Sequence, residues 1–135
     1  AEYIALTPGD FNTHDNTTTR EYGPVVQNEG SHISMNSTSY NAYAMKIVPK
    51  GFTAVTAVVY GASAGASAGV WNAYSSSISL GSNSTTLTGN TALGTTDTFS
   101  TSITGDGTTY CILEFNPGDT TDDVYGGKIT LKKST

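Results

Sequence analysis

The sequence has few charges, and basic residues are the scarcer kind. Lys and Arg total 6 against 11 Asp and Glu, only 13% of the 135 residues are charged, and the formal net charge is −5. Proteins that bind nucleic acid neutralise phosphates with clustered basic side chains, and this chain has no such stripe. A surface that binds anionic membranes needs the same basic clusters. We therefore expect neither nucleic acid nor membrane as a partner.

Cysteine is almost absent as well. Cys111 is the single cysteine, so no disulfide can form within the chain. It lies in the apolar run YCILEF, without a basic neighbour, which predicts a buried and unreactive thiol. A lone cysteine is typical of folding in a reducing cytosol. The opening AEYIALTPGD lacks the pattern of a secretory signal peptide, and no apolar stretch reaches the roughly 18 residues of a membrane-spanning helix.

Hydroxyl residues are abundant where charges are few. The chain contains 15 Ser and 23 Thr, together 38 hydroxyl residues, which favour strands and turns over helices. Apolar residues mostly recur at every second position, and Gly, Asn and Pro interrupt them every few residues. The run FTAVTAVVYG is apolar on both faces and predicts a central strand. We predict an all-β protein, an antiparallel, jelly-roll-like β-sandwich of about eight or nine short strands.

The length indicates a single domain over residues 1–135. Residues 8–28 are polar and rich in turn formers, which predicts a surface loop or arm. The segment GSNSTTLTGNTALGTTDT is low in complexity and predicts a loop with one irregular strand. A half-buried strand is expected over 42–47, where Ala42 and Ala44 alternate with larger apolar residues, and the last strand is expected over 125–132.

One segment matches the residue types of a catalytic motif but lacks the helical pattern that should follow it. Gly61–Gly65 reads GASAG and fits the G-x-S-x-G nucleophile elbow, with Ser63 in the nucleophile position. No helical pattern follows, and a second GASAG overlaps the first, as any alternation of Gly, Ala and Ser produces. A hydrolase that uses Ser63 with His14 or His32 is therefore a remote hypothesis. We expect no catalytic residues, no enzyme activity and no cofactor.

The densest acidic cluster, Asp119, Asp122 and Asp123, contains the weak candidates for a metal site. Such acids also keep a sheet edge soluble and cap turns through hydrogen bonds from backbone amides. The second explanation is the ordinary one, so we expect no metal site. The glycine pair after this cluster, Gly126 and Gly127, follows Tyr125, and we interpret these three residues as a structural turn in which a residue with a Cβ would be resisted.

Aromatic residues allow a second kind of function. Trp71 and eight tyrosines could form a platform that stacks on sugar rings, and Trp71 is the candidate for that contact. Most of the tyrosines fall at strand positions, where packing explains them equally well. A glycan- or receptor-binding module, such as a tail-fibre or adhesin domain, is therefore the alternative hypothesis.

Four phrases in a fixed order carry a resemblance to a known group of proteins. YIALTPGDF opens the chain, IVPKGFTAVTAVVYG lies in its middle, YCILEF follows, and DDVYGGKITL comes near the end. This order resembles small virion proteins of marine tailed phages, especially cyanophages, with an L-x-P-x-DF start and a D-[DE]-x-YGG-x-[IV]-T ending. The resemblance spans about half of the chain, and DDVYGGKIT is its most distinctive part.

The resemblance implies a β-sandwich on the surface of a virion. It implies a capsid decoration or head-surface protein that binds the major capsid protein or other virion proteins. It further implies a homo-oligomer, with a trimer as one candidate, assembled in the host bacterial cytoplasm and then part of the virion. No catalytic residues carry over. A non-enzymatic phage structural protein is accordingly the leading hypothesis.

Overall fold

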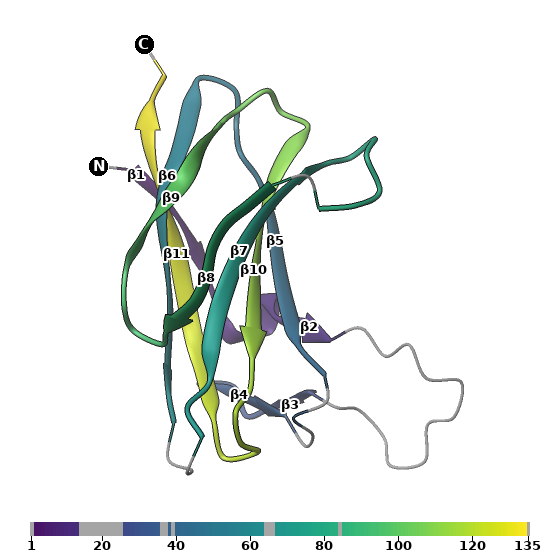
Figure 1. Cartoon of the computed structure of the whole chain (residues 1–135), viewed down its shortest axis with the longest axis vertical. Helices are drawn as coiled ribbons and strands as arrows, with labels where there is room; N and C mark the ends of the chain where they lie inside the picture. Colours follow the sequence, from purple (N-terminus) through teal and green to yellow (C-terminus); the bar gives the residue numbers. More distant parts are fainter. Residues whose placement is uncertain are drawn as a thin grey trace.

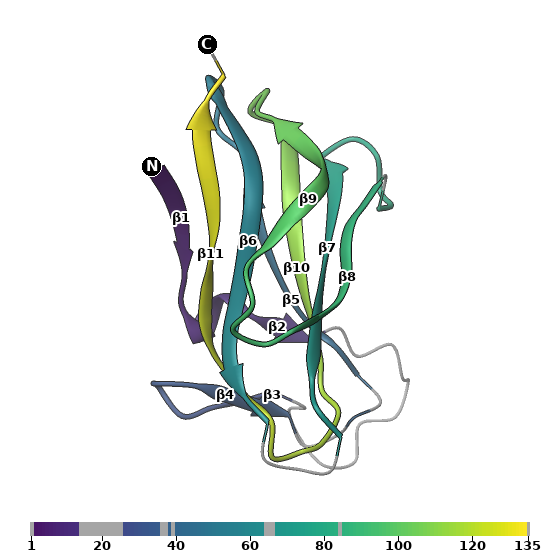
Figure 2. The same cartoon turned by 60° about the vertical axis from the view of Figure 1, so that its left-hand side comes forward.

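The protein is a β-sandwich of two antiparallel sheets, as predicted (Figure 1). The structure is a computed structural model that describes residues 2–13, 26–35, 38, 40–63, 67–83 and 85–134. Figure 2 shows the two sheets as separate layers. Within the described ranges, no helix is long and apolar enough to cross a membrane.

The described residues form eleven strands in two sheets. Sheet A contains β1 (Glu2–Leu6), β3 (Val26–Asn28), β4 (Ile33–Met35), β6 (Phe52–Ala62), β9 (Asp97–Thr104) and β11 (Asp123–Lys133). Sheet B contains β2 (Asn12–Thr13), β5 (Ala42–Ile47), β7 (Val70–Ser77), β8 (Thr85–Ala92) and β10 (Thr109–Asn116). A 3-10 turn, η1 (Pro8–Asp10), follows β1.

The strand order is that of a jelly roll. Sheet A has the order β3-β4-β11-β6-β9, with β1 also paired to β11, and sheet B has the order β2-β5-β10-β7-β8. The eight strands from β4 to β11 can be counted one to eight along the chain. In sheet A, β4, β11, β6 and β9 are then the first, eighth, third and sixth strands. In sheet B, β5, β10, β7 and β8 are the second, seventh, fourth and fifth. This alternation of sheets along the chain is the double Greek key of a jelly roll.

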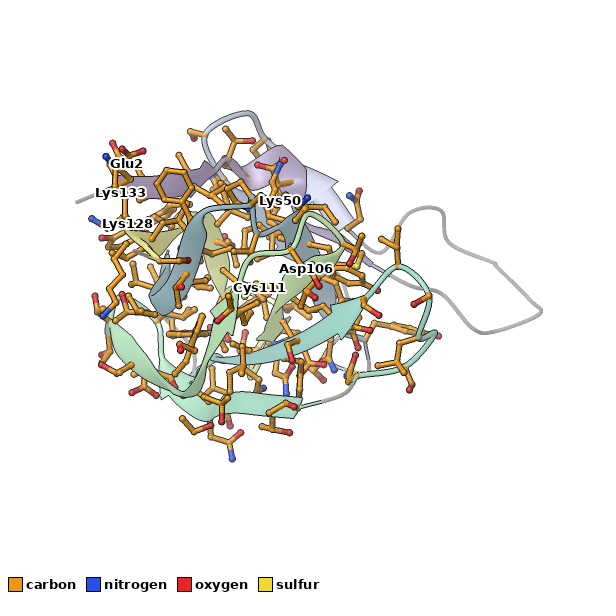
Figure 3. All side chains as sticks on the ribbon, turned by 90° about the horizontal axis from the view of Figure 1, so that it is seen from above. Glu2, Lys50, Asp106, Cys111, Lys128 and Lys133 are labelled. Atoms are coloured by element: carbon orange, nitrogen blue, oxygen red, sulfur yellow. The ribbon has the colours of Figure 1, made fainter. Side chains whose placement is uncertain are left out.

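Strand alternation places one face of each sheet in a shared core. Cys111, Leu113 and Phe115 of β10 point inward, and so do Ile129 and Leu131 of β11. Cys111 is a free and buried thiol near the centre of the view in Figure 3. Burial raises the pKa of this thiol to about 12, so it is the unreactive cysteine expected.

Three boundaries differ from the predicted ones. The short strands β2 and β3 lie within the segment 8–28 that was expected to be a polar arm, and residues 14–25 lie outside the described ranges. The low-complexity segment forms a full strand, β8, which pairs with β7. The last strand begins at Asp123 rather than Tyr125 because β6 extends far enough to pair with both Asp123 and Val124.

The turn between β9 and β10 is organised by one carboxylate. Asp106 Oδ1 accepts hydrogen bonds from the backbone amides of Thr108 and Thr109, at 2.8 and 2.7 Å, and each threonine hydroxyl donates one further bond to the carboxylate. These donors favour the charged form, and the amides of Thr108 and Thr109 are the main cause of a lowered Asp106 pKa.

This turn predicts a specific pH dependence. A carboxyl group whose pKa is lower in the folded state stabilises the fold above its ordinary pKa of 3.8, and that stabilisation is lost progressively as the pH falls below this value. We expect Asp106→Ala to unfold at lower urea concentration than the parent at pH 7, with a smaller difference at pH 2.5. Urea midpoints at both pH values test this, and an identical difference at the two pH values would contradict it.

Candidate functional site

The candidate site is the outer face of the three central strands of sheet B. Strand alternation places nine side chains on it, in three rows that run across β5, β10 and β7. The rows are Tyr43–Glu114–Asn72, Met45–Ile112–Tyr74 and Ile47–Tyr110–Ser76. Ala44, Leu113 and Ala73, which lie between them along the three strands, are buried in the core. We refer to these nine residues as the sheet B outer face.

One edge of this face is apolar and exposed. Met45 is 56% exposed and Ile47 is 42% exposed, and both lie beside β10 residues of the same face. Ile78 and Leu80, in the turn after β7, are also exposed large apolar side chains. The amide of Ile78 donates to the carbonyl of Thr108, which keeps this turn beside the start of β10. Grouped apolar side chains at a surface are typical of an interaction site.

The other edge holds a carboxylate between aromatic residues. Glu114 is only 8% exposed, and its Oε1 accepts a 3.1 Å bond from Asn72 Nδ2 and a 3.3 Å bond from the Tyr74 hydroxyl. Burial and then the Glu114 charge raise the pKa of Tyr74. The pKa of Tyr43, on the other side of Glu114, is also raised, by burial first and in smaller part by the same carboxylate. The tyrosines therefore stay protonated as donors, and this buried charge is satisfied.

The two outer faces of the sandwich differ in charge. On sheet A, the Lys128 ammonium lies 5.4 Å from the centre of the Tyr3 ring. Figure 3 places Glu2, Lys128 and Lys133 together at one corner of the molecule, all from the paired strands β1 and β11. The nine residues of the sheet B outer face include no lysine or arginine. Contact with another molecule would therefore remove water from fewer charged side chains on the outer face of sheet B than on that of sheet A.

Trp71 is not part of this surface. Its side chain is 0% exposed in the core, and its Nε1 donates a 3.1 Å bond to the carbonyl of Ala92 on β8. The hypothesis that Trp71 stacks on a sugar therefore has no support in the structure, because the ring faces the opposite sheet.

Ser63 and the histidines do not form a catalytic pair in the described residues. Ser63 Oγ accepts a 3.0 Å bond from the amide of Gly69, which closes the connection between β6 and β7. His32 contacts the Ser31 hydroxyl at 3.2 Å and lies 3.9 Å from Asp123 Oδ1. His14 lies outside the described residues.

Two carboxylates of the acidic cluster, Asp119 and Asp122, accept hydrogen bonds within their own loop. Asp119 Oδ1 accepts bonds from the amide and hydroxyl of Thr121, and these lower the Asp119 pKa. Asp122 Oδ2 accepts bonds from the amides of Gly118 and Asp119, at 2.9 and 3.1 Å, while Asp123 lies beside His32. Across the described ranges, no group of three or more His, Cys, Asp or Glu side chains is placed to hold a metal ion.

The residues expected to form a turn, Tyr125 to Gly127, lie inside β11 at a β-bulge. The pairing of β11 with β6 shifts there, so that Tyr125 is the extra residue. Gly126 has a φ of 141°, and a Cβ on it would overlap the carbonyl oxygen of Leu6. A Cβ on Gly127 would lie 2.5 Å from the carbonyl oxygen of Val58. The glycine pair therefore lets β1 and β6 approach β11 closely from its two sides.

A scan of protein-family models finds no match to this chain, and a search of curated proteins finds none either. The fold and the chemistry of its surfaces therefore carry the functional argument.

Sequence reasoning did not identify the sheet B outer face. The alternation of Ala42 and Ala44 with Tyr43, Met45 and Ile47 was visible, but alternation does not tell which set faces inward. The pairing with β10 decides it, because Phe115 fills the interior next to Ala42, so the small residues of β5 face the core.

Proposed function

We propose that this chain is a non-enzymatic structural protein of a phage virion, of the capsid decoration or head-surface kind. Its sheet B outer face docks on a protein of the capsid shell. The observation that carries this proposal is the exposed pair Met45 and Ile47 at the apolar edge of the nearly uncharged sheet B outer face. Protein interfaces are enriched in Tyr and Met at their centres and depleted in Lys, which is the composition found here.

The energetics of this face also support a protein partner. Its single carboxylate, Glu114, already accepts bonds from Asn72 and Tyr74, so contact would not leave an unpaired charge. Jelly rolls occur in viral capsid proteins and in lectins, which is an argument by analogy of fold. The order of YIALTPGDF and DDVYGGKIT in the sequence resembles phage virion proteins and favours the first of these two groups.

The proposal predicts that charges on the apolar edge abolish binding to capsid shells. We expect Met45→Glu with Ile47→Glu to weaken co-sedimentation with purified shells at least 30-fold, which corresponds to a loss of about 2 kcal/mol of binding free energy from two buried anchor residues. Tyr60→Glu is the matched control, because Tyr60 is similarly exposed but lies on sheet A, and it should bind as the parent does. Equal binding by the two variants would contradict the proposal.

Self-association is part of the same proposal. Light scattering coupled to size exclusion should give the mass of a closed oligomer, with a trimer as the leading candidate. A monomer at all concentrations would restrict the protein to docking as single copies.

A glycan-binding module is the second candidate function, and the cluster around Glu114 favours it. Tyr43 and Tyr74 flank a carboxylate and the amide of Asn72, which is a combination of aromatic rings and hydrogen-bonding groups that suits a sugar. A glycan array separates the two functions. Saccharide binding that disappears in Tyr43→Ala and Tyr74→Ala, together with no binding to shells, would replace the virion proposal with this one.

A further inference from the structure

Two buried acceptor atoms at the loop between β10 and β11 have no hydrogen-bond partner among the described residues. They are Oδ1 of Asn116 and Oδ1 of Asp122. Asp122 is 0% exposed, and it is one of the largest fully buried side chains of the protein. A buried carboxylate oxygen without a partner is costly, since folding removes the water that would solvate it. Both atoms are acceptors, so each requires a positively polarised partner.

One oxygen atom of each of these two residues, other than the two unpaired atoms themselves, lies beside Gly69. A Cβ on Gly69 would lie 2.8 Å from Asp122 Oδ2 and 3.3 Å from the carbonyl oxygen of Asn116. On the other side of the loop, a Cβ on Gly118 would lie 2.6 Å from the carbonyl oxygen of Ala68 and 2.7 Å from that of Ser67. A carboxylate oxygen and several main-chain oxygens therefore lie where two loops meet, and the glycines avoid a clash between a side chain and these atoms.

We propose that Asp122 and Asn116 bind a calcium ion at this junction. Asp122 Oδ2 is occupied by the amides of Gly118 and Asp119, which leaves Oδ1 as a monodentate ligand. The amide oxygen of Asn116 is the second side-chain ligand, and main-chain carbonyls and water complete the shell. Calcium accepts this all-oxygen set with irregular geometry, whereas magnesium requires a near-ideal octahedron and zinc prefers nitrogen and sulfur.

The ion would join two parts of the chain that are far apart in sequence. Asn116 ends β10, Asp122 precedes β11, and Gly69 precedes β7. A hydrogen bond from the amide nitrogen of Asn116 to Asp122 is the competing arrangement, because it would satisfy the same carboxylate without an ion. Asn116→Asp, which introduces a second carboxylate, distinguishes the two arrangements. It should strengthen the binding of a calcium ion, whereas it should remove the hydrogen bond between the amide and Asp122.

The first experiment uses the unaltered protein. With calcium in large excess over its dissociation constant, we expect the melting temperature to rise by about 5–10 °C over the value in EDTA, and magnesium should give a smaller rise. Terbium should show luminescence sensitised by Trp71, whose backbone pairs with Phe115 next to Asn116. Equal melting temperatures in calcium and EDTA overturn the proposal.

The second experiment uses three variants. Asp122→Asn should lose the calcium-dependent rise, whereas Asp119→Asn should keep it, because Asp119 is occupied by Thr121 and has no unpaired buried atom. Asn116→Asp should melt lower than the parent in EDTA and gain a larger rise in calcium. If Asn116→Asp melts lower and calcium restores nothing, the amide arrangement is correct and the calcium site is overturned, even if Asp122→Asn does not fold.

Discussion

Replacement of Gly126 with valine should lower the free energy of unfolding by about 3–5 kcal/mol, enough to reduce the melting temperature by roughly 10 °C or more. Two separate costs produce this effect. A φ of 141° is strained for any residue with a Cβ, and that Cβ would overlap the carbonyl oxygen of Leu6. The chain would have to move β1 away from β11 and lose part of their five-residue pairing, Glu2–Leu6 with Gly127–Leu131.

Two other glycines separate these costs. Gly81 has a φ of 78° with no atom within 4 Å of its Cβ position, so Gly81→Ala should show the conformational cost alone, about 1 kcal/mol. At Gly89, which is exposed on the edge strand β8, the nearest atom to the Cβ position is 3.4 Å away and φ is not left-handed, so Gly89→Ala should be nearly neutral. Urea denaturation followed by far-UV circular dichroism measures all three. An unchanged melting temperature for Gly126→Val would refute the close approach of β1.

The second large effect is expected at Trp71. We expect Trp71→Ala to lower the free energy of unfolding by about 3–5 kcal/mol, because it removes the largest fully buried side chain and leaves a cavity between the sheets. It also removes the bond from Nε1 to the carbonyl of Ala92. The loss should be followed by far-UV circular dichroism, since the variant contains no tryptophan.

An exposed aromatic residue provides the comparison for Trp71. Tyr125→Ala removes a half-exposed ring at the bulge of β11 and should change the free energy of unfolding by about 0.5 kcal/mol or less. In the parent protein, Trp71 fluorescence should be blue-shifted and insensitive to acrylamide until the chain unfolds. Strong quenching by acrylamide in the folded state, with a near-neutral Trp71→Ala, would instead describe a surface platform for sugars.

Both predictions bear on the proposed function. The bulge at Gly126 and the core around Trp71 hold the two sheets in place, and the sheet B outer face is flat enough to dock only if its three central strands keep their register. If Gly126→Val or Trp71→Ala fails to bind shells, the cause would be loss of the folded structure. Loss of shell binding in Met45→Glu with Ile47→Glu, at an unchanged melting temperature, would report the docking surface itself.

The sequence by itself determined the class of the fold and a small part of its interior. Period-two alternation and the scarcity of helix formers predict strands locally, so the all-β sandwich, the central strand FTAVTAVVYG and the buried Cys111 could all be read without coordinates. These properties depend on neighbours within a few residues along the chain.

The tertiary structure decided which face of each strand is buried and what each marked residue does. Trp71 faces the core, while Met45 and Ile47 face outward, because strands from distant parts of the chain compete to fill one interior volume. Gly126 lies in a bulge rather than a turn because β6 pairs beyond it. Asp122 is buried because the β6–β7 connection covers its loop, a contact between segments about fifty residues apart that no local pattern encodes.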